Sequence, residues 1–273
     1  MTINLIASDL DGTLLAPDHV SVTPRTLSAL TSAHSKGVKI AISTGRTLSL
    51  IKNVAEKLPF VDYIIYSNGA GVYDCKEKKT VFVEPVEKYK AEKITELLDR
   101  LGVYYNVYAD GNIYLTPASD TSIFEKVDLP KDFLHQFLSI SITVPDINTS
   151  TRDMETELIV AYFTPDDARE KIMNLVNELG ELHTVSSFSD NIEIMSEKAS
   201  KGNAVKAICD IIGCTADNVM TFGDAWNDCS MLEFAAHSFA MANGDEKCKQ
   251  SAKSICPSNA ENGVAQMIEK FIL

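Results

Sequence analysis

The chain has 273 residues, of which 45% are hydrophobic and 23% charged, and its formal net charge is -13 at pH 7. This composition is typical of a globular protein with a sizeable core, and the length fits one large domain or two of medium size. The acidic excess repels phosphate backbones. It therefore argues against nucleic acid as a partner, and any anionic substrate requires a local positive pocket.

The first residues lead directly into a strand pattern, without the basic leader and apolar segment of a signal peptide, and no apolar run has membrane length. We therefore expect a cytoplasmic protein with no membrane partner. The six cysteines include no closely spaced pair, and the five histidines lack the spacing of a zinc site. Reduced thiols and no zinc are expected.

The first predicted element is an apolar strand over residues 3–7, followed at once by Asp9 and Asp11. Such a run is typical of a strand buried on both faces of a parallel sheet, and ligands bind at the carboxyl ends of such strands. Alternation along an extended chain places both carboxylates on one side, where they require a cation or a shared proton. The alternative is an ordinary turn, in which Gly12 gives a sharp bend and Thr13 hydrogen-bonds locally.

A βα pattern continues from there. Helices are predicted at about 24–36 and 48–58, and buried strands at 38–42 and 63–66. Ser43-Thr44-Gly45-Arg46 follows the second strand, and Asn68 lies in the glycine-rich turn after the third. This order predicts parallel strands with right-handed crossovers, which brings Thr44 and Asn68 to the same sheet edge as Asp9.

The pattern of predicted elements changes after the third strand: short strands with hairpin turns alternate with two longer helices. The predicted strands cover residues 72–73, 80–83, 104–108, 112–115, 138–144, 157–163, 181–186 and 191–195, and the helices cover 86–101 and 165–179. We interpret residues 84–190 as an inserted α+β domain. Residues 1–83 and 191–273 would form an α/β core, a doubly wound parallel sheet.

The βα pattern resumes at Ser200, which is expected to cap a helix over 201–212 that begins with Lys201. A strand over 218–222 then ends in Gly223-Asp224-Ala225-Trp226-Asn227-Asp228. The remaining elements are predicted as helices over 229–236 and 262–271 and a strand over 237–241. A parallel sheet would bring this acidic strand end to the edge that carries Asp9.

Carboxylates, one lysine and hydroxyl or amide donors are thus expected at one edge. Mg²⁺ prefers carboxylate and carbonyl oxygens, and lysine and threonine suit phosphoryl oxygens. Each residue also has an ordinary explanation: Asp224 and Asp228 as an acidic helix start, Lys201 as a solvated lysine, Arg46 as the partner of an acidic neighbour, Asn68 as a turn residue. Their joint occurrence at strand ends favours a magnesium and phosphate site.

Four stretches, in this order, resemble the motifs of the haloacid dehalogenase (HAD) superfamily. They are Asp9-Leu10-Asp11-Gly12-Thr13, Ser43-Thr44-Gly45-Arg46, Lys201-Gly202 and Gly223-Asp224-Ala225-Trp226-Asn227-Asp228. The large insertion between the second and third motifs, and the Ser-Lys-Gly-x-Ala form of the third, resemble the Cof-type sugar-phosphatase branch. The resemblance implies a Rossmann-like core, with the insertion as a cap domain that closes over the site.

The resemblance also implies roles for single residues. Asp9 would be the nucleophile that forms an aspartyl phosphate, and Asp11 the general acid and then the base. The cofactor would be Mg²⁺, held by Asp9, Asp11, Asp224 and Asp228. Phosphate or substrate would be bound by Leu10, Thr44, Gly45, Arg46, Asn68, Lys201 and Asn227. Cap residues would set specificity, with Tyr105, Tyr108, Tyr114 and Asn191 as candidates, although aromatic residues in strands more often serve packing.

The expected activity is Mg²⁺-dependent hydrolysis of small phosphate esters, sugar phosphates above all, by a monomer or weak homodimer. The alternatives are a phosphatase of a phosphorylated cofactor such as flavin mononucleotide or pyridoxal phosphate, a phosphosugar mutase, and a metabolite-binding pseudoenzyme. A signalling receiver also combines an acidic cluster, a lysine and a phosphorylated aspartate. Receivers are shorter and lack the insertion, and a residue like Asp11 that speeds loss of the phosphoryl group does not suit a stored signal.

Overall fold

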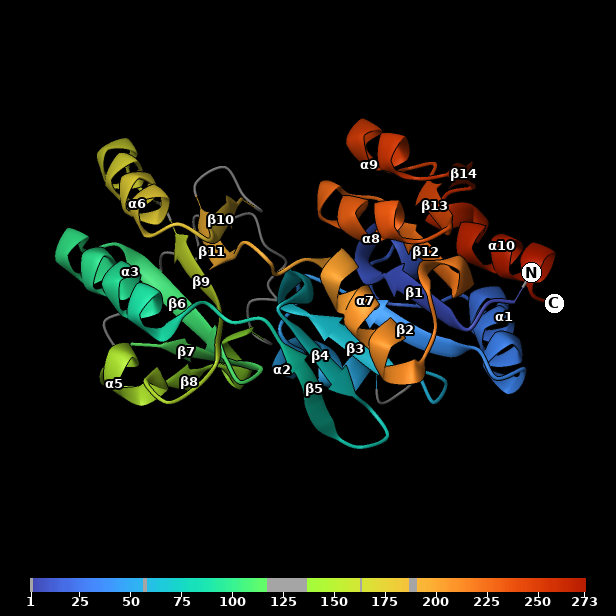
Figure 1. Cartoon of the computed structure of the whole chain (residues 1–273), viewed down its shortest axis with the longest axis horizontal. Helices are drawn as coiled ribbons and strands as arrows, with labels where there is room; N and C mark the ends of the chain where they lie inside the picture. The colour runs from blue at the N-terminus through green and yellow to red at the C-terminus, as the bar shows by residue number, and fades with distance from the viewer. Residues whose placement is uncertain (1, 56–57, 117–136, 163, 187–190) are drawn as a thin grey trace. The chain divides into compact units, whose positions relative to one another are not determined.

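The computed structural model describes residues 2–55, 58–116, 137–162, 164–186 and 191–273. The chain divides into two compact units (Figure 1). Unit 1 comprises Met1–Arg46, Lys52–Phe82 and Ser200–Leu273, and unit 2 comprises Thr47–Ile51 and Val83–Ala199. Across the described ranges, every helix is too short or too polar to cross a lipid bilayer.

Unit 1 is built on a sheet of eight strands within the described residues, in the order β14-β13-β12-β1-β2-β3-β4-β5. The strands are β1 (Leu5–Asp9), β2 (Lys39–Ser43), β3 (Tyr63–Tyr66), β4 (Gly71–Asp74), β5 (Lys79–Val83), β12 (Val219–Gly223), β13 (His237–Met241) and β14 (Ser254–Cys256). The six from β14 to β3 are parallel, and β4 is antiparallel to β3. This confirms the predicted α/β fold with a parallel-sheet core.

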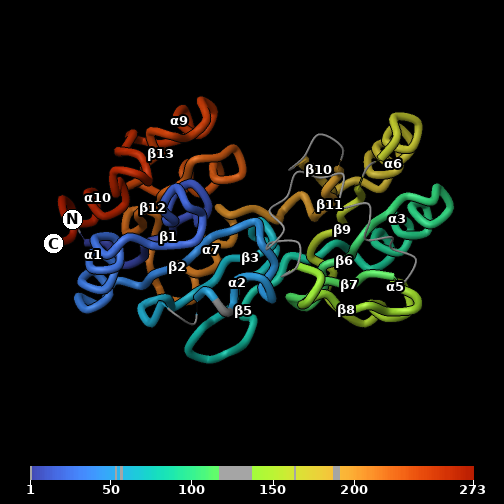
Figure 2. Tube along the Cα trace, turned by 180° about the vertical axis from the view of Figure 1, so that it is seen from behind, coloured from blue at the N-terminus to red at the C-terminus, as the bar shows by residue number. Residues whose placement is uncertain are grey.

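Five helices contact the strands of this sheet: α1 (Pro24–Ser35), α7 (Lys201–Ile212), α8 (Cys229–Phe234), α9 (Glu246–Ser251) and α10 (Gly263–Phe271). Helix α2 (Leu48–Ala55) begins in unit 2 and ends in unit 1. Ala204, Val205 and Ile208 of α7 share an apolar cluster with Leu5 and Ala7 of β1, so α7 covers one face of the central strands. It lies in front of the sheet in Figure 1, and Figure 2 shows β1 and β2 side by side from behind.

The local sequence explains where two of these helices begin. The Thr23 hydroxyl accepts the Thr26 N–H at 3.2 Å, and Pro24 occupies the first position of α1, where its missing N–H costs nothing. The Ser200 hydroxyl likewise accepts the Asn203 N–H at 3.1 Å at the start of α7. The Ser200 cap agrees with the sequence prediction and fixes the start of the helix that carries Lys201.

Unit 2 contains a sheet of six strands within the described residues, in the order β10-β11-β9-β6-β7-β8. The strands are β6 (Tyr104–Ala109), β7 (Asn112–Leu115), β8 (Ile142–Thr143), β9 (Thr156–Tyr162), β10 (Leu182–Val185) and β11 (Ile192–Ser196), and the helices are α3 (Lys88–Leu101), α5 (Ile147–Thr151) and α6 (Asp166–Leu179). Helices α3 and α6 contact each other, and apolar residues of both share a core with Tyr105, Val107 and Ile159 of the sheet.

Two sequence expectations need correction. The predicted core segment 191–273 begins too early, because β11 pairs antiparallel with β9 and β10 and unit 2 therefore extends to Ala199. The predicted strand over 138–144 is reduced to Ile142–Thr143, because residues 137–140 form a helical turn that Ser141 closes by donating its N–H and hydroxyl to the Phe137 carbonyl. Phe163 and Asp190, at the ends of two predicted segments, lie outside the described residues.

Candidate active site

The site begins where β1 ends. All five residues of β1 are buried, and its last residue, Asp9, is 7% exposed. Asp11 (φ -82°, ψ 120°) and Gly12 (φ 83°, ψ -7°) then form a type II turn, which requires a positive φ at its third position. A Cβ atom on Gly12 would lie 2.4 Å from Asp224 Oδ2. Glycine is therefore needed both for the turn and for its close approach to Asp224.

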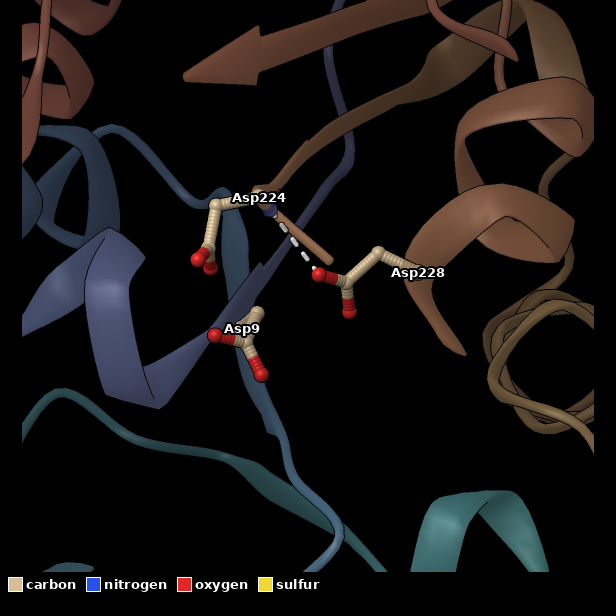
Figure 3. A group of neighbouring side chains, drawn as sticks. All are labelled: Asp9, Asp224 and Asp228. Atoms are coloured by element: carbon tan, nitrogen blue, oxygen red, sulfur yellow. Dashed lines mark hydrogen bonds between the residues drawn. The ribbon is translucent and has the colours of Figure 1, made fainter. Parts of the chain in front are cut away.

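Three carboxylates meet at this edge of the sheet. Asp9, Asp224 and Asp228 each offer one oxygen, and these atoms lie within 4.8 Å of one another (Figure 3). The arrangement follows from the strand order, because β1 and β12 are parallel neighbours with Ser8 opposite Phe222. Asp9 and the residues after β12 therefore leave the sheet side by side.

Lys201 joins two of these carboxylates. Its side chain is fully buried, and Nζ donates to Asp9 Oδ1 at 2.7 Å and to Asp228 Oδ1 at 2.5 Å. The close packing of α7 on α8 makes this possible. A Cβ atom on Gly202 would lie 2.5 Å from the carbonyl oxygen of Ser230, so a larger residue would separate the two helices.

Asp228 organises the loop after β12. Its second oxygen, Oδ2, accepts the backbone N–H groups of Asp224 at 2.9 Å and Ala225 at 3.0 Å, and the first of these bonds is drawn in Figure 3. Both carboxylate oxygens of Asp228 are thus occupied by donors from the chain. Its role in this structure is to hold Lys201 and the Asp224 loop in place.

Burial shapes the electrostatics of the cluster. Desolvation raises the pKa of Asp9 well above its ordinary value, and the nearby carboxylates Asp228 and Asp224 raise it further against the opposing effect of Lys201. Burial likewise raises the pKa of Asp224. For Lys201, desolvation lowers the pKa, but Asp228 and Asp9 outweigh it and the net shift is upward. Three carboxylates against one ammonium leave an excess of negative charge, which a divalent cation would neutralise.

The Asp11 side chain is engaged elsewhere. It forms a two-pronged ion pair with Arg46, with Nη2 to Oδ1 at 2.6 Å and Nε to Oδ2 at 3.0 Å. Alternation in an extended strand predicts that Asp9 and Asp11 present their carboxylates together. The strand ends at Asp9 and the chain turns at once, so the carboxylate group contains Asp9 with Asp224 and Asp228 and does not include Asp11.

The predicted polar residues of the neighbouring strand ends are also brought together. Asn68 has φ 56°, donates its N–H to the Thr44 carbonyl at 3.1 Å, and accepts Asn227 Nδ2 on its side-chain oxygen at 3.0 Å. A Cβ atom on Gly45 would lie 2.9 Å from that same oxygen. The loops after β2, β3 and β12 therefore interlock around one edge, with the Thr44 side chain buried.

Two supporting residues were not recognised from the sequence. Thr13 was expected to hydrogen-bond within its own turn, but its hydroxyl donates to Asp224 Oδ1 at 2.7 Å, across the site. Asn243 Nδ2 donates to the Gly12 carbonyl at 2.8 Å and holds the turn from the loop after β13. The signal for Asn243 was its position after a parallel strand, at the edge where the other site residues lie.

The comparisons with known proteins agree with this geometry. The family model described as haloacid dehalogenase-like hydrolase matches residues 6–268. The chain is 29% identical to the pyridoxal phosphate phosphatase YbhA of Escherichia coli over 100% of both chains. It is 26% identical to the 5-amino-6-(5-phospho-D-ribitylamino)uracil phosphatase YcsE of Bacillus subtilis, over 99% of this chain and 96% of the relative.

A solved structure of a haloacid dehalogenase-like hydrolase from B. subtilis is 28% identical and aligns with a TM-score of 0.80, over 99% of this chain and 100% of that one. The chain thus belongs to the haloacid dehalogenase-like hydrolases. Within that family its curated relatives carry phosphatase names, so it is placed among the phosphatases.

Proposed function

We propose that this protein hydrolyses small phosphomonoesters, sugar phosphates above all, in an Mg²⁺-dependent reaction through an aspartyl phosphate formed on Asp9. One observation carries the proposal: a buried Asp9 carboxylate is held by Lys201 at 2.7 Å, beside the carboxylates of Asp224 and Asp228. A buried carboxylate fixed by a lysine is suited to attack, because it is oriented and shielded from water.

The chemistry would proceed in two displacements. A carboxylate oxygen of Asp9 forms a bond to phosphorus while the bond from phosphorus to the alcohol oxygen breaks, and Asp11 gives the leaving oxygen its proton. Asp11 then takes a proton from water as that water attacks phosphorus, which releases phosphate and restores Asp9. In this structure Arg46 donates to both oxygens of Asp11, so this pair would have to release one oxygen for Asp11 to carry the proton that it gives to the leaving group.

The residues fit a hard divalent cation. Asp9 and Asp224 would hold Mg²⁺, with the main-chain carbonyl of Asp11 as the resemblance implies, while Asp228 positions its neighbours through the bonds described above. Bound there, Mg²⁺ would offset the repulsion between the carboxylate nucleophile and an anionic phosphate. The phosphoryl oxygens would be held by Leu10, Thr44, Gly45, Lys201 and Asn227. Arg46 and Asn68 would contact the rest of the substrate.

We further propose that unit 2, which comprises Thr47–Ile51 and Val83–Ala199 where the sequence predicted 84–190, acts as the cap of this enzyme. A cap would exclude bulk water and present side chains to the leaving group. The names of YbhA and YcsE support pyridoxal phosphate and a phosphorylated ribitylaminouracil as candidate substrates to set beside sugar phosphates.

The test is phosphate release from a panel of sugar phosphates, pyridoxal phosphate and flavin mononucleotide, with Mg²⁺ or EDTA. Asp9→Asn removes the nucleophile at constant size, and we expect turnover to fall by about 10³-fold or more. Asp210→Asn, an exposed aspartate on α7, is the matched control and should retain activity. Turnover that survives in Asp9→Asn, or in EDTA, would refute the mechanism, and transfer of phosphate to a sugar in place of water would indicate a mutase.

A further inference from the structure

A second pocket lies in unit 1, at the opposite edge of the sheet from Asp9. β2 and β3 begin at Lys39 and Tyr63, and their other ends lead into the loops of the candidate active site. Beside these amino ends, the pocket is lined by residues from the last turn of α1, the end of α2 and the β4–β5 hairpin (Figure 1). Its volume of about 550 Å³ is that of a small-molecule site.

The charge of this pocket is opposite to that of the chain. Its described lining residues include one carboxylate, Asp62, and four lysines, which are Lys39, Lys52, Lys76 and Lys78. The whole chain has 38 acidic residues against 25 lysines and arginines. An acidic surface repels small anions, so a local excess of cations is where such a ligand would bind.

Asp62 belongs to the framework of the pocket. Its Oδ1 accepts Lys39 Nζ at 2.8 Å, and its Oδ2 accepts the Ile40 N–H at 3.0 Å. The hydrogen bond to Asp62 raises the pKa of Lys39, so this pair is charged at neutral pH. His34 Nε2 lies 3.5 Å from Oδ2. The carboxylate is thus engaged by Lys39 and the backbone, and it leaves the other three lysines unneutralised.

Those three lysines have no acidic partner of their own. Across the described ranges, Lys52, Lys76 and Lys78 form no ion pair. Lys52 Nζ lies 5.2 Å from the centre of the Tyr73 ring, which orients the ammonium group without cancelling its charge. Asp74, at the end of β4, accepts the Lys76 backbone N–H at 2.9 Å and so shapes the hairpin turn.

Lys78 occupies a position that disfavours its own residue type. Its φ is 54°, in the left-handed region where a Cβ atom is crowded and glycine is at no disadvantage. The turn itself therefore gives no reason for a lysine, because glycine would form it with less strain. The Lys78 side chain lines the pocket, and binding there gives the lysine a use that its backbone does not.

We propose that this pocket binds a small organic anion that carries at least two negative charges on an apolar or aromatic body, which is the chemistry of a nucleotide. Lys52, Lys76 and Lys78 would bind the anionic groups. Leu58 and Val61 also line the pocket and would contact the body of the ligand. The site is separate from the carboxylate cluster at the other edge of the sheet, so it does not depend on the proposed phosphatase function.

The first test is calorimetric titration of the full chain with ADP in EDTA. Without a divalent cation, the carboxylates of the active site disfavour an anion there. We expect ADP to bind with a Kd below about 1 mM, and adenosine and pyrophosphate to bind at least about tenfold more weakly. Asp9→Asn should bind ADP as wild type does. No binding of ADP, its loss in Asp9→Asn, or equal affinity for pyrophosphate or adenosine would overturn the proposal.

Paired variants locate the binding. Lys52→Gln combined with Lys76→Gln removes two charges from the pocket. Lys206→Gln combined with Lys247→Gln removes the same charge from exposed lysines of α7 and α9 and is the matched control. We expect the Kd for ADP to rise at least about tenfold in the first variant and less than about twofold in the control. Equal losses would show only the effect of net charge and would refute the site.

Lys78→Gly separates a binding role from a structural one. Glycine relieves the left-handed conformation, so the Tm should rise by about 2 to 5 °C. The Kd for ADP should nevertheless rise at least about threefold, because one of the three ammonium groups is gone. A fall in Tm would show that the lysine serves the fold, and unchanged affinity would show that the ligand does not use it. Either result would count against the proposal.

Discussion

At the scale of single residues, the site depends on close approaches that only small side chains permit. Gly12 combines a positive φ with a backbone that lies against the Asp224 carboxylate. Gly37 has nearly the same backbone conformation, with φ 90°, but a Cβ atom there would meet nothing within 4 Å. Substitutions at the two glycines can therefore distinguish two effects: the stability lost through a left-handed backbone conformation, and the activity lost when Asp224 is displaced.

We therefore predict different outcomes for Gly12→Ala and Gly37→Ala. Both should lower the free energy of unfolding by about 1 to 2 kcal/mol, because a left-handed conformation disfavours any Cβ atom. Gly12→Ala should also push Asp224 aside and reduce kcat/KM by about 10- to 100-fold, with a weaker response to Mg²⁺. Phosphate release and thermal unfolding measure the two effects. Equal activity in the two variants would contradict the assigned role of Gly12.

The residues that the sequence could identify are those with local signatures. Asp9, Lys201 and Asp224 follow strands or open a helix, so their common edge follows from the βα order alone. The cap candidates Tyr105 and Tyr114 have no such signature and lie in the apolar core of unit 2, because a tyrosine in a strand does not reveal which face of that strand is covered. That depends on α3 and α6 packing on the alternate residues, which is a property of the tertiary structure.

At the scale of elements, helix α7 decides whether Lys201 reaches the carboxylates. Its first residue is Lys201, and the Ser200 hydroxyl satisfies the free N–H of Asn203 in the first turn. Fraying of that turn would move the ammonium away from Asp9 and Asp228. The start of α1 is capped in the same manner by Thr23, but on a helix that supplies none of the proposed catalytic residues.

Loss of the two caps should thus have similar effects on stability and different effects on activity. We expect Ser200→Ala and Thr23→Ala each to reduce the free energy of unfolding by about 1 kcal/mol. Only Ser200→Ala should lower kcat, by about three- to tenfold, since it loosens the lysine that orients the nucleophile. Denaturant unfolding and steady-state kinetics provide the comparison. A kcat loss shared by both variants would point to general destabilisation.

Elements buried on both faces were predicted well, because an uninterrupted apolar run between turns indicates a parallel strand regardless of its partners. The element that was assigned to the wrong domain is one whose place depends on the strands with which it pairs. β11 is fully buried like a core strand, and only its antiparallel pairing with β9 and β10 assigns it to unit 2. The domain boundary was placed too early for this reason.

At the scale of the whole molecule, the buried carboxylates link folding to pH. Without Mg²⁺, Asp9 has a folded-state pKa raised by burial above its ordinary value of 3.8, so the folded state binds this proton more tightly. The stability that this proton binding provides is complete below the unfolded pKa and is lost as pH rises through the raised folded pKa. At neutral pH the metal-free protein therefore carries an electrostatic cost that Asn at position 9 would remove.

The measurement is the Tm of wild type and Asp9→Asn in EDTA from about pH 4 to pH 8. We expect the Tm of Asp9→Asn to increase relative to the wild-type Tm as pH rises, by several degrees near pH 8. Mg²⁺ should raise the wild-type Tm more than the Tm of the variant. Comparing the variants at each pH cancels the titration of all other groups. Parallel Tm profiles of the two proteins in EDTA would show that Asp9 does not carry this electrostatic cost.

The pairing of β1 with β12 has a consequence for how the protein is made. Leu5 of β1 pairs with Val219 of β12, more than 200 positions further along the chain, so a ribosome that adds about 5 to 20 residues per second needs about 10 to 40 s between them. Throughout that interval the nascent chain holds β1, a strand that is buried in the folded protein, with one edge still unpaired. Such an edge invites pairing with other chains. The growing polypeptide is thus most vulnerable to aggregation before its last quarter emerges, and chaperone binding would matter most in that window.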